Sequence, residues 1–197
     1  YDRQKTGKGM FIDVSMLDCQ IAILENAIAR YLSKNEIPKP MGSRHPSIAP
    51  FEAFKTKDSY IIIAAGNDKL YEKLCNVLEI PEMIIDKRFN TNSLRCENMN
   101  ELKEIFENQL KNKNTLDWVR QMEELKIPCG PIFNIKEAVE NPQVEARNMI
   151  VNAYHKVVGD FRTAGNPIKM SSYEDKKSRG DIPDLDEHRE KILKEFT

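Results

Sequence analysis

The sequence predicts an α+β protein built around a small two-layer α+β domain. Residues 51–54 and 60–65 are two apolar runs joined by the polar turn KTKDS, which is the pattern of a β-hairpin. Apolar residues then recur every three or four positions over residues 70–125, as is typical of helices that bury one face. Four prolines fall within residues 34–50, so we place a domain boundary in that linker.

Before the linker, residues 7–15 predict a turn followed by a short strand. Ser15 and Asp18 have the spacing of a capping box, in which a hydroxyl and a carboxylate bind the free amides at a helix start. The helix that follows carries one apolar stripe, which must be buried against another surface. The stripe consists of Leu17, Ile21, Leu24, Ile28 and Tyr31.

Beyond the hairpin, Asn67 or Asp68 is placed to cap the next helix, and a connecting stretch with one helical turn follows it. Two longer helices are expected at residues 99–110 and 116–125. Thr115 is the predicted cap of the second one.

The last third of the chain predicts shorter elements. Asn134 caps a short helix, and Asn141-Pro142 begins another with proline at the first helical position. Residues 150–170 predict a hairpin that turns at Gly159-Asp160. A charged loop and a final short helix at residues 188–196 complete the chain.

The composition excludes several classes of protein. Thirty basic and 31 acidic residues leave a net charge of −1 without a basic, aromatic-rich stretch, so no nucleic-acid partner is expected. The apolar runs are shorter than the ~20 residues of a membrane helix, and the polar start YDRQKTGKG predicts no signal peptide. The separated Cys19, Cys75, Cys96 and Cys129 form no metal-ligating pair and indicate reduced thiols in a cytoplasmic protein.

The strand at residues 60–65 runs directly into Gly66-Asn67-Asp68, which we name the elbow. A strand end followed by a helix start exposes backbone N–H groups that can hold an anion or a carbonyl oxygen, and glycine lets a ligand approach closely. The alternative is an ordinary strand–helix turn. No phosphate-binding loop, GxSxG or HExxH motif is present. His45, beside Arg44, is either a structural residue or a substrate contact.

Five stretches of the chain are informative when taken together: TGKGMFIDVSMLD, RHPSIAPFEAFKTKDSYIIIAAGNDKLYEKLC, DKRFNTNSLRCENMNEL, IPCGPIFNIKEAVENPQVEARNMI and GNPIKMS. They resemble the class III CoA-transferase family, the group of formyl-CoA transferase and carnitine CoA-transferase. They occur in the order and with the spacing of the family. Within the family, the chain looks most like transferases that handle dicarboxylic or small hydroxy-acid CoA esters.

The resemblance implies a large Rossmann-like α/β domain and a small α+β domain joined by two linkers, with two chains interlocked as a homodimer. Residues 1–44 then end the large domain and its linker, residues 45–150 form the small domain, and residues 151–197 return to the large domain. The implied substrates are an acyl-CoA and a free carboxylic acid. No metal or other cofactor is implied, because coenzyme A enters as part of the substrate.

The resemblance also implies an aspartate nucleophile that carries coenzyme A as a thioester, in the manner of covalent catalysis. In the family this aspartate precedes the TGKG turn in a D-x-x-x-G stretch, so it is expected upstream of Tyr1. We do not assign this role to Asp13 or Asp18, because both flank a predicted helix start, where the helix dipole favours a negative charge. The chain is therefore predicted to be a C-terminal portion that is catalytically incomplete alone.

By the same resemblance, the elbow is the active-site loop that shields the aspartyl thioester from water. Met16 is either a neighbour of the coenzyme A thiol or a core methionine, and Arg44 and His45 are candidate contacts of the acceptor acid. Two alternatives stay open. The first is that the chain belongs to an acyl-CoA racemase of the same fold; racemases carry a glutamate near the position of Asn67, and Asp68 is adjacent to that position. The second is that the chain is a non-catalytic fragment that serves only as a binding or assembly piece.

Overall fold

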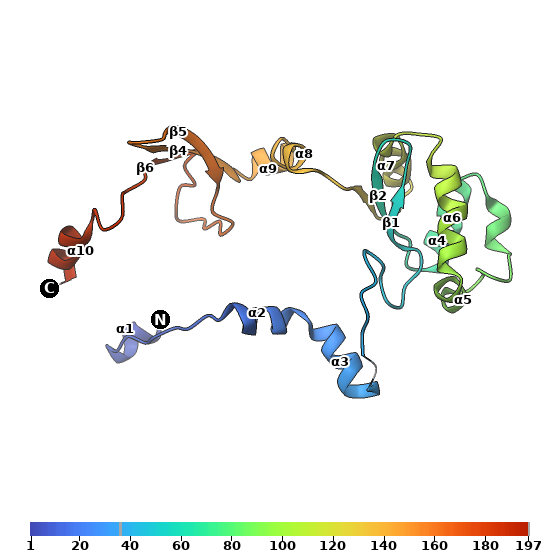
Figure 1. Ribbon diagram of the computed structural model, residues 1–197, viewed down its shortest axis with the longest axis horizontal. Coiled ribbons are helices and arrows are strands. Elements are labelled where there is room, and N and C mark those ends of the chain that lie inside the picture. Colours follow the sequence, from blue (N-terminus) through green and yellow to red (C-terminus); the bar gives the residue numbers. More distant parts are fainter. Residues whose placement is uncertain (36, 197) are drawn as a thin grey trace. The chain divides into compact units, whose positions relative to one another are not determined.

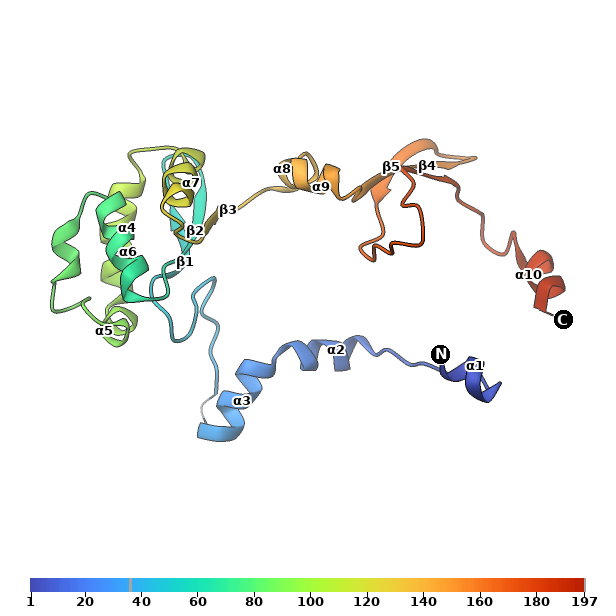
Figure 2. The same cartoon turned by 180° about the vertical axis from the view of Figure 1, so that it is seen from behind.

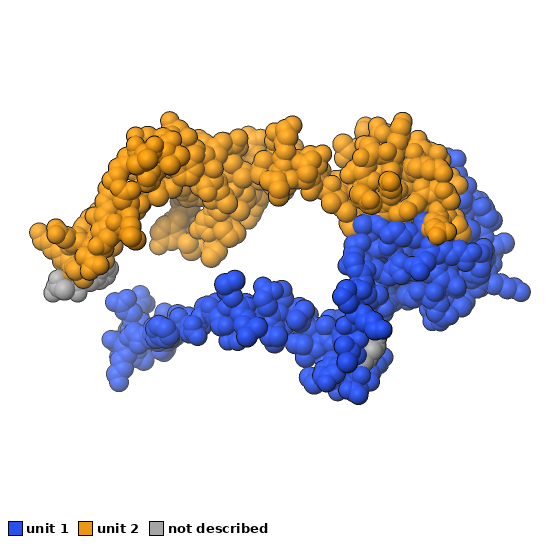
Figure 3. Space-filling view, in the orientation of Figure 1, with its two compact units in different colours: residues 1–53, 63–103 blue, residues 54–62, 104–197 orange. Residues whose placement is uncertain are grey.

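A computed structural model describes residues 1–35 and 37–196, and position 36 of the predicted linker lies outside the described residues. Helices and two small sheets form an α+β structure, as predicted (Figures 1 and 2). The chain divides into two compact units, residues 1–53 with 63–103 and residues 54–62 with 104–197 (Figure 3). No helix among the described residues is both long and apolar enough to cross a membrane.

The predicted hairpin is present. β1 (Phe51–Lys55) and β2 (Tyr60–Ala64) share a three-stranded sheet with β3 (Cys129–Pro131), in the order β1-β2-β3. The backbone N–H of Thr56 donates to the carbonyl of Ser59 at 2.9 Å and closes the turn. A link this short joins antiparallel strands, because parallel strands need a crossover of a dozen or more residues.

Two amphipathic helices account for much of the core. α6 (Met99–Leu110) has the predicted bounds, and α7 (Thr115–Glu124) begins one residue earlier than predicted. Their apolar faces are buried, as the helical spacing predicts. The buried side chains are Met99, Leu102, Phe106 and Leu110 on α6 and Trp118, Val119 and Met122 on α7.

The predicted cap of α7 is wrong. Asn114 is the N-cap residue, and Thr115 is the first helical residue. Asp58, in the turn between β1 and β2, supplies the capping oxygen instead: its Oδ1 accepts from the backbone N–H and from the hydroxyl of Thr115, each at 2.8 Å. These two hydrogen bonds lower the pKa of Asp58. The carboxylate thus satisfies one amide at the helix start, which the N-cap side chain of Asn114 leaves free.

Three further elements lie between the hairpin and α6. α4 (Asp68–Val77) is the predicted helix, and η1 (Pro81–Ile84) is the predicted single turn. The sequence does not predict α5 (Asn92–Glu97), because six residues are too few to display a helical period. The side chain of Thr91 caps α5 by accepting from the N–H of Leu94 at 3.3 Å.

A second sheet has the order β5-β4-β6 (Figure 1). β4 (Ile150–His155) and β5 (Gly159–Ala164) pair antiparallel, with His155 opposite Gly159. The predicted hairpin is therefore confirmed, but Gly159 and Asp160 belong to β5 and the turn comes before them. β6 (Ser178–Asp181) pairs parallel to β4 within the stretch predicted as a loop. All four of its residues are exposed, so no alternation reveals this strand.

The first apolar stripe lies on two helices rather than on one. α2 (Met16–Ile23) and α3 (Glu25–Lys34) are separated at Leu24. The Ser15 side chain accepts from the N–H of Asp18 at 3.4 Å, which confirms the predicted helix start. None of the described residues of either helix is buried, and within the described chain only Ile28 of the stripe is partly covered.

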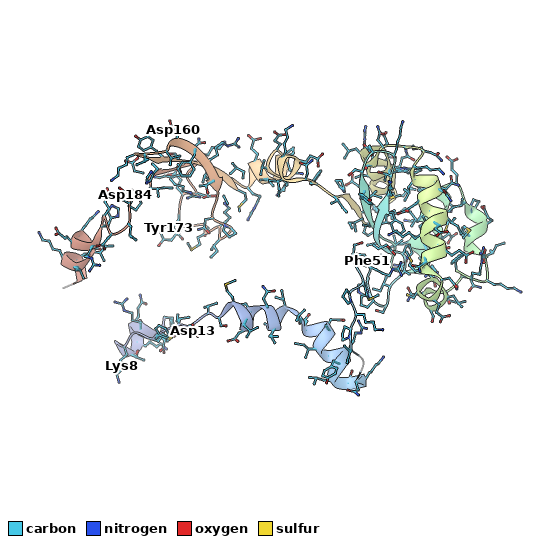
Figure 4. All side chains as sticks on the ribbon, viewed as in Figure 1. Lys8, Asp13, Phe51, Asp160, Tyr173 and Asp184 are labelled. Atoms are coloured by element: carbon cyan, nitrogen blue, oxygen red, sulfur yellow. The ribbon has the colours of Figure 1, made fainter. Side chains whose placement is uncertain are left out.

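The strand predicted within residues 7–15 is not formed. These residues connect α1 (Asp2–Thr6) to α2, and Figure 4 places Asp13 on this irregular stretch. A strand requires a partner for its backbone groups, and no described strand pairs with this one.

Three short helices follow β3 at the predicted places: α8 (Ile135–Val139), α9 (Pro142–Ala146) and α10 (Arg189–Phe196). Asn134 caps α8 in a complete capping box. Its side chain accepts from the N–H of Glu137 at 3.0 Å, and the Glu137 carboxylate accepts from the N–H of Asn134 at 2.8 Å.

Candidate active-site loop

The elbow joins the end of β2 to the start of α4. Of the two predicted caps, Asn67 is the N-cap, and its side-chain oxygen accepts from the N–H of Leu70 at 3.0 Å. Gly66, Asn67 and Asp68 are all exposed. The three residues therefore present a strand-to-helix corner to the surroundings, as the sequence predicts.

The entry to the elbow is tightly packed. The N–H of Ala65 donates to the carbonyl of Pro50 at 3.0 Å. A Cβ atom at position 66 would lie 3.1 Å from Cγ2 of Ile48, which is closer than ordinary van der Waals contact. Glycine thus lets the elbow rest directly on the segment that precedes β1.

The exit from the elbow is held by Arg95, which the sequence does not single out. Arg95 lies on α5 and is completely buried. Its Nη2 donates to Oδ1 of Asp68 at 2.7 Å, and its Nε donates to the carbonyl of Ala49 at 2.9 Å. A third bond runs from Nη1 to the carbonyl of Phe89 at 3.0 Å, and the guanidinium lies 4.4 Å from the ring centre of Tyr71.

No local signal marks Arg95, because its partners Ala49 and Asp68 lie 46 and 27 residues away in the chain. Asn92, on the same short helix, reinforces the arrangement. Its side chain accepts from the N–H of Ala49 at 3.0 Å and donates to the carbonyl of Ser47 at 2.9 Å. Both α5 side chains therefore fix the segment beneath the elbow.

Arg44 belongs to an ionic cluster around Glu52, which is almost fully buried. Its Nε donates to Oε1 of Glu52 at 2.9 Å, and its Nη2 donates to the Asn100 side chain at 2.9 Å. Lys103 binds the other carboxylate oxygen at 2.5 Å. Two cations, Arg44 and Lys103, thus bind the two oxygens of one buried carboxylate.

The imidazole of His45 stacks on the ring of Phe51, which Figure 4 labels at the start of β1. The ring centres are 5.3 Å apart, and the planes are inclined by 11°. Nδ1 accepts from the N–H of Ser47 at 3.2 Å, so the neutral ring carries its proton on Nε2.

A small cavity of about 70 Å³ brings Arg44 and His45 together. Ile48 lines the same cavity and also touches the position of the missing Gly66 side chain. The cavity thus lies next to the floor of the elbow. Its other lining residues are Met41, Pro46, Ala49, Cys96 and Met99.

Met16 is the first residue of α2, and its side chain is 85% exposed. Met16 is therefore not a core methionine within the described chain, and no hydrogen bond or ring contact joins Met16 to the elbow. Its proximity to the coenzyme A thiol stays a prediction.

The four cysteines are free thiols, as predicted. Burial raises the pKa of Cys75 to about 11 and also raises the pKa values of Cys96 and Cys129. These thiols stay protonated at neutral pH and are therefore poor nucleophiles. The described residues contain no group of three or more His, Cys, Asp or Glu side chains that could hold a metal ion.

The sequence model of the family described as CoA-transferase family III matches residues 1–189, which is almost the whole chain. The chain belongs to CoA-transferase family III. An acetyl-CoA:oxalate CoA-transferase of Acetobacter aceti is 37% identical over 196 residues, which are 100% of this chain and 49% of the relative. A succinyl-CoA:glutarate CoA-transferase of Homo sapiens is 36% identical over 98% of this chain and 44% of the relative.

Among solved structures, a CAIB/BAIF family protein from Brucella suis superposes with a TM-score of 0.78 and 34% identity. The match covers 100% of this chain and 50% of that protein. The chain thus spans about half the length of the relatives that it matches. The family identified from the sequence is confirmed, and it is a family of enzymes.

The geometry of the elbow bears on the racemase alternative. The oxygen of Asn67 is engaged by the N–H of Leu70, and the carboxylate of Asp68 is engaged by Arg95. A base that abstracts a proton must offer a free lone pair to the substrate. The amide of Asn67 cannot act as such a base, and the carboxylate of Asp68 has one of its two oxygens, Oδ1, held by Arg95.

Proposed function

We propose that this chain forms the part of a CoA-transferase that covers the reacting thioester. The enzyme moves coenzyme A from an acyl-CoA donor to a free carboxylic acid. The observation that carries the proposal is the family match over residues 1–189. Two relatives have names that pair an acyl-CoA with oxalate or glutarate, so we propose a short dicarboxylic acid as the acceptor.

The proposed exchange uses an aspartate outside residues 1–197. This aspartate attacks the donor thioester, which gives an acyl–aspartyl anhydride and releases the coenzyme A thiolate. The thiolate then attacks the aspartyl carbonyl, frees the donor acid and leaves an aspartyl-CoA thioester. The acceptor carboxylate reverses these two steps and regenerates the aspartate. No electron is gained or lost, so no cofactor is proposed beyond the coenzyme A of the substrate.

In this proposal the elbow covers the aspartyl thioester. Water would hydrolyse the thioester to the free acid and the thiol, so excluding water preserves it for the acceptor. Met16 is proposed to lie near the coenzyme A thiol.

The enzyme is proposed to act as an interlocked homodimer, and sedimentation of an upstream-extended version tests whether it is a dimer. A purely monomeric active species would contradict that assembly.

Arg44 and His45 are proposed to face the acceptor acid. Support comes from the cavity that both residues line next to the elbow. Arg44→Met should raise KM for the dicarboxylic acid while leaving KM for the acyl-CoA unchanged. Arg120→Met is the matched control, because Arg120 is exposed and pairs only with Asp117 among the described acids. An equal effect on both substrates would contradict the role of Arg44.

The exchange itself is tested by supplying acetyl-CoA or succinyl-CoA with oxalate or glutarate and detecting new CoA esters by mass. The chain is assayed alone and in a version extended upstream. Activity in the extended version only is the expected result. Activity of the chain alone would place the nucleophile within residues 1–197. The absence of exchange in both versions would overturn CoA transfer as the function.

A further inference from the structure

The buried guanidinium of Arg95 binds the two sides of the elbow at once. One donor holds the carbonyl of Ala49, which follows the residue that Gly66 rests on. Another donor holds the carboxylate of Asp68, at the first residue of α4. A single side chain therefore joins the floor beneath the elbow to the helix that leaves it.

The burial of Arg95 makes this link costly to break. Arg95 is 0% exposed, whereas Asp68 is 77% exposed in its side chain. Asp68 is the single carboxylate paired with Arg95 among the described residues. If the elbow moved outward, the carboxylate would enter water without difficulty, but the guanidinium would stay buried without its counter-charge. A buried charge that loses its partner is strongly unfavourable.

We propose that Arg95 is a positioning residue that fixes the elbow in its covering position, so that the elbow acts as a static cover and not as a hinged lid. Three contacts support this position. They are the Ala65–Pro50 hydrogen bond at the entry, the packing of Gly66 on Ile48, and the Asp68–Arg95 ion pair at the exit. The catalytic consequence rests on the proposed CoA transfer, whereas the fixing of the elbow does not.

The fixing is tested by hydrogen exchange on the 197-residue chain. Asp68→Asn is the main variant, because Asp68 is exposed and an amide of the same size removes the charge without creating a cavity. The probes are the N–H groups of Ala65, Leu70 and Tyr71, each of which is hydrogen-bonded. We expect them to exchange about tenfold faster in Asp68→Asn, a factor that corresponds to about 1.4 kcal/mol. Unchanged exchange would overturn the proposal.

Asp117→Asn is the matched control. Asp117 also lies in the first turn of a helix and pairs with an exposed arginine, Arg120, at 3.0 Å. The control removes the same charge from the first turn of α7, so the exchange of the amides next to Asp117 gives the size of the helix-dipole effect where the partner arginine is exposed. Arg95→Lys is the second test variant. It keeps the charge but cannot reach three acceptors in a fixed fork, and it should also speed exchange at the elbow.

The catalytic consequence is measured in the upstream-extended version as the ratio of acyl-CoA hydrolysis to transfer. We expect Asp68→Asn to raise this ratio about tenfold and Asp117→Asn to leave it unchanged. A merely structural role would lower both rates together and leave the ratio constant, which would overturn the positioning role. If the parent transfers no coenzyme A at all, the proposed function fails, whereas the exchange experiment still decides whether Arg95 fixes the elbow.

Discussion

α6 and the α2–α3 pair carry the same kind of sequence pattern but end in opposite environments. On α6, Leu102, Phe106 and Leu110 recur at helical spacing and are completely buried. On α2 and α3, an equally regular stripe stays open to solvent, with Leu17 69% exposed. A period of 3.6 residues therefore predicts which face of a helix is apolar. It does not tell what covers that face, because the cover comes from elsewhere in the fold or from another molecule.

Hydrogen exchange should give the largest contrast between the two regions. The amides of α6 and α7 should be protected up to the global free energy of unfolding, because their apolar faces are packed. Those of α2 and α3 should exchange almost as fast as amides of an unfolded peptide, since isolated helices of this length are marginal in water. Equal protection at low protein concentration would show that another surface covers the stripe. Protection that grows with concentration would indicate self-association.

Truncating one aromatic residue of α6 and one of the stretch that leads into α2 sharpens the comparison. Phe106→Ala should lower the free energy of unfolding by about 3–5 kcal/mol, because Phe106 is buried and packs 5.8 Å from the ring of Phe54. Phe11→Ala should change it by less than about 0.5 kcal/mol, because Phe11 is 91% exposed. Urea denaturation of both variants provides the measurement. A cost of several kcal/mol for Phe11→Ala would mean that the first segment is packed in solution.

A smaller effect is expected from the hydrogen bonds that join Thr115, at the start of α7, to Asp58 and Thr56. Thr115→Val removes a buried hydroxyl that contacts Asp58 and Thr56 and should cost about 1–3 kcal/mol of unfolding free energy. Thr163→Val on β5 is the matched control, because Thr163 is exposed and should be nearly neutral. Thermal or urea unfolding distinguishes the two. Equal stabilities would show that the hydroxyl of Thr115 contributes nothing to the long-range cap.

Lowering the pH should have the smallest effect on stability, and this effect should be confined to the surroundings of Asp175. Lys169 and Arg179 bind Asp175 and lower its pKa to about 2. A carboxyl whose pKa falls on folding stabilises the fold above its unfolded pKa of 3.8, and this contribution disappears as the pH falls through about 2. The protection factors of amides in residues 169–179, which are corrected for the intrinsic pH dependence of exchange, should therefore fall between about pH 4 and pH 2. In Asp175→Asn this dependence on pH should vanish, and its persistence would assign the effect to another group.

Asp86 is the internal comparison for that experiment. Its pKa is also lowered to about 2, by hydrogen bonds from Arg88 only two residues away. Protonation of Asp86 releases a local turn, whereas protonation of Asp175 releases two cations from different parts of the last segment. An NMR titration of both carboxyl groups follows the two events separately, and Asp86 should perturb fewer amides.

The sequence by itself determined the features that depend on neighbouring residues. Asn67 and Asn134 cap their helices because a short polar side chain reaches the N–H groups two or three residues ahead. The bounds of α6 follow from its apolar period. The elbow is predictable for the same reason, since its strand, glycine and cap are consecutive.

Only the tertiary structure decided which distant groups complete those local features. Asp58 caps α7 across 57 residues, β6 finds its partner in β4, and Arg95 reaches Ala49 and Asp68 from a helix that the sequence does not reveal. Each contact satisfies a buried or unpaired polar group, and such a requirement has no fixed spacing along the chain. Local chemistry thus fixed where the elbow is, and long-range polar contacts decided how it is held.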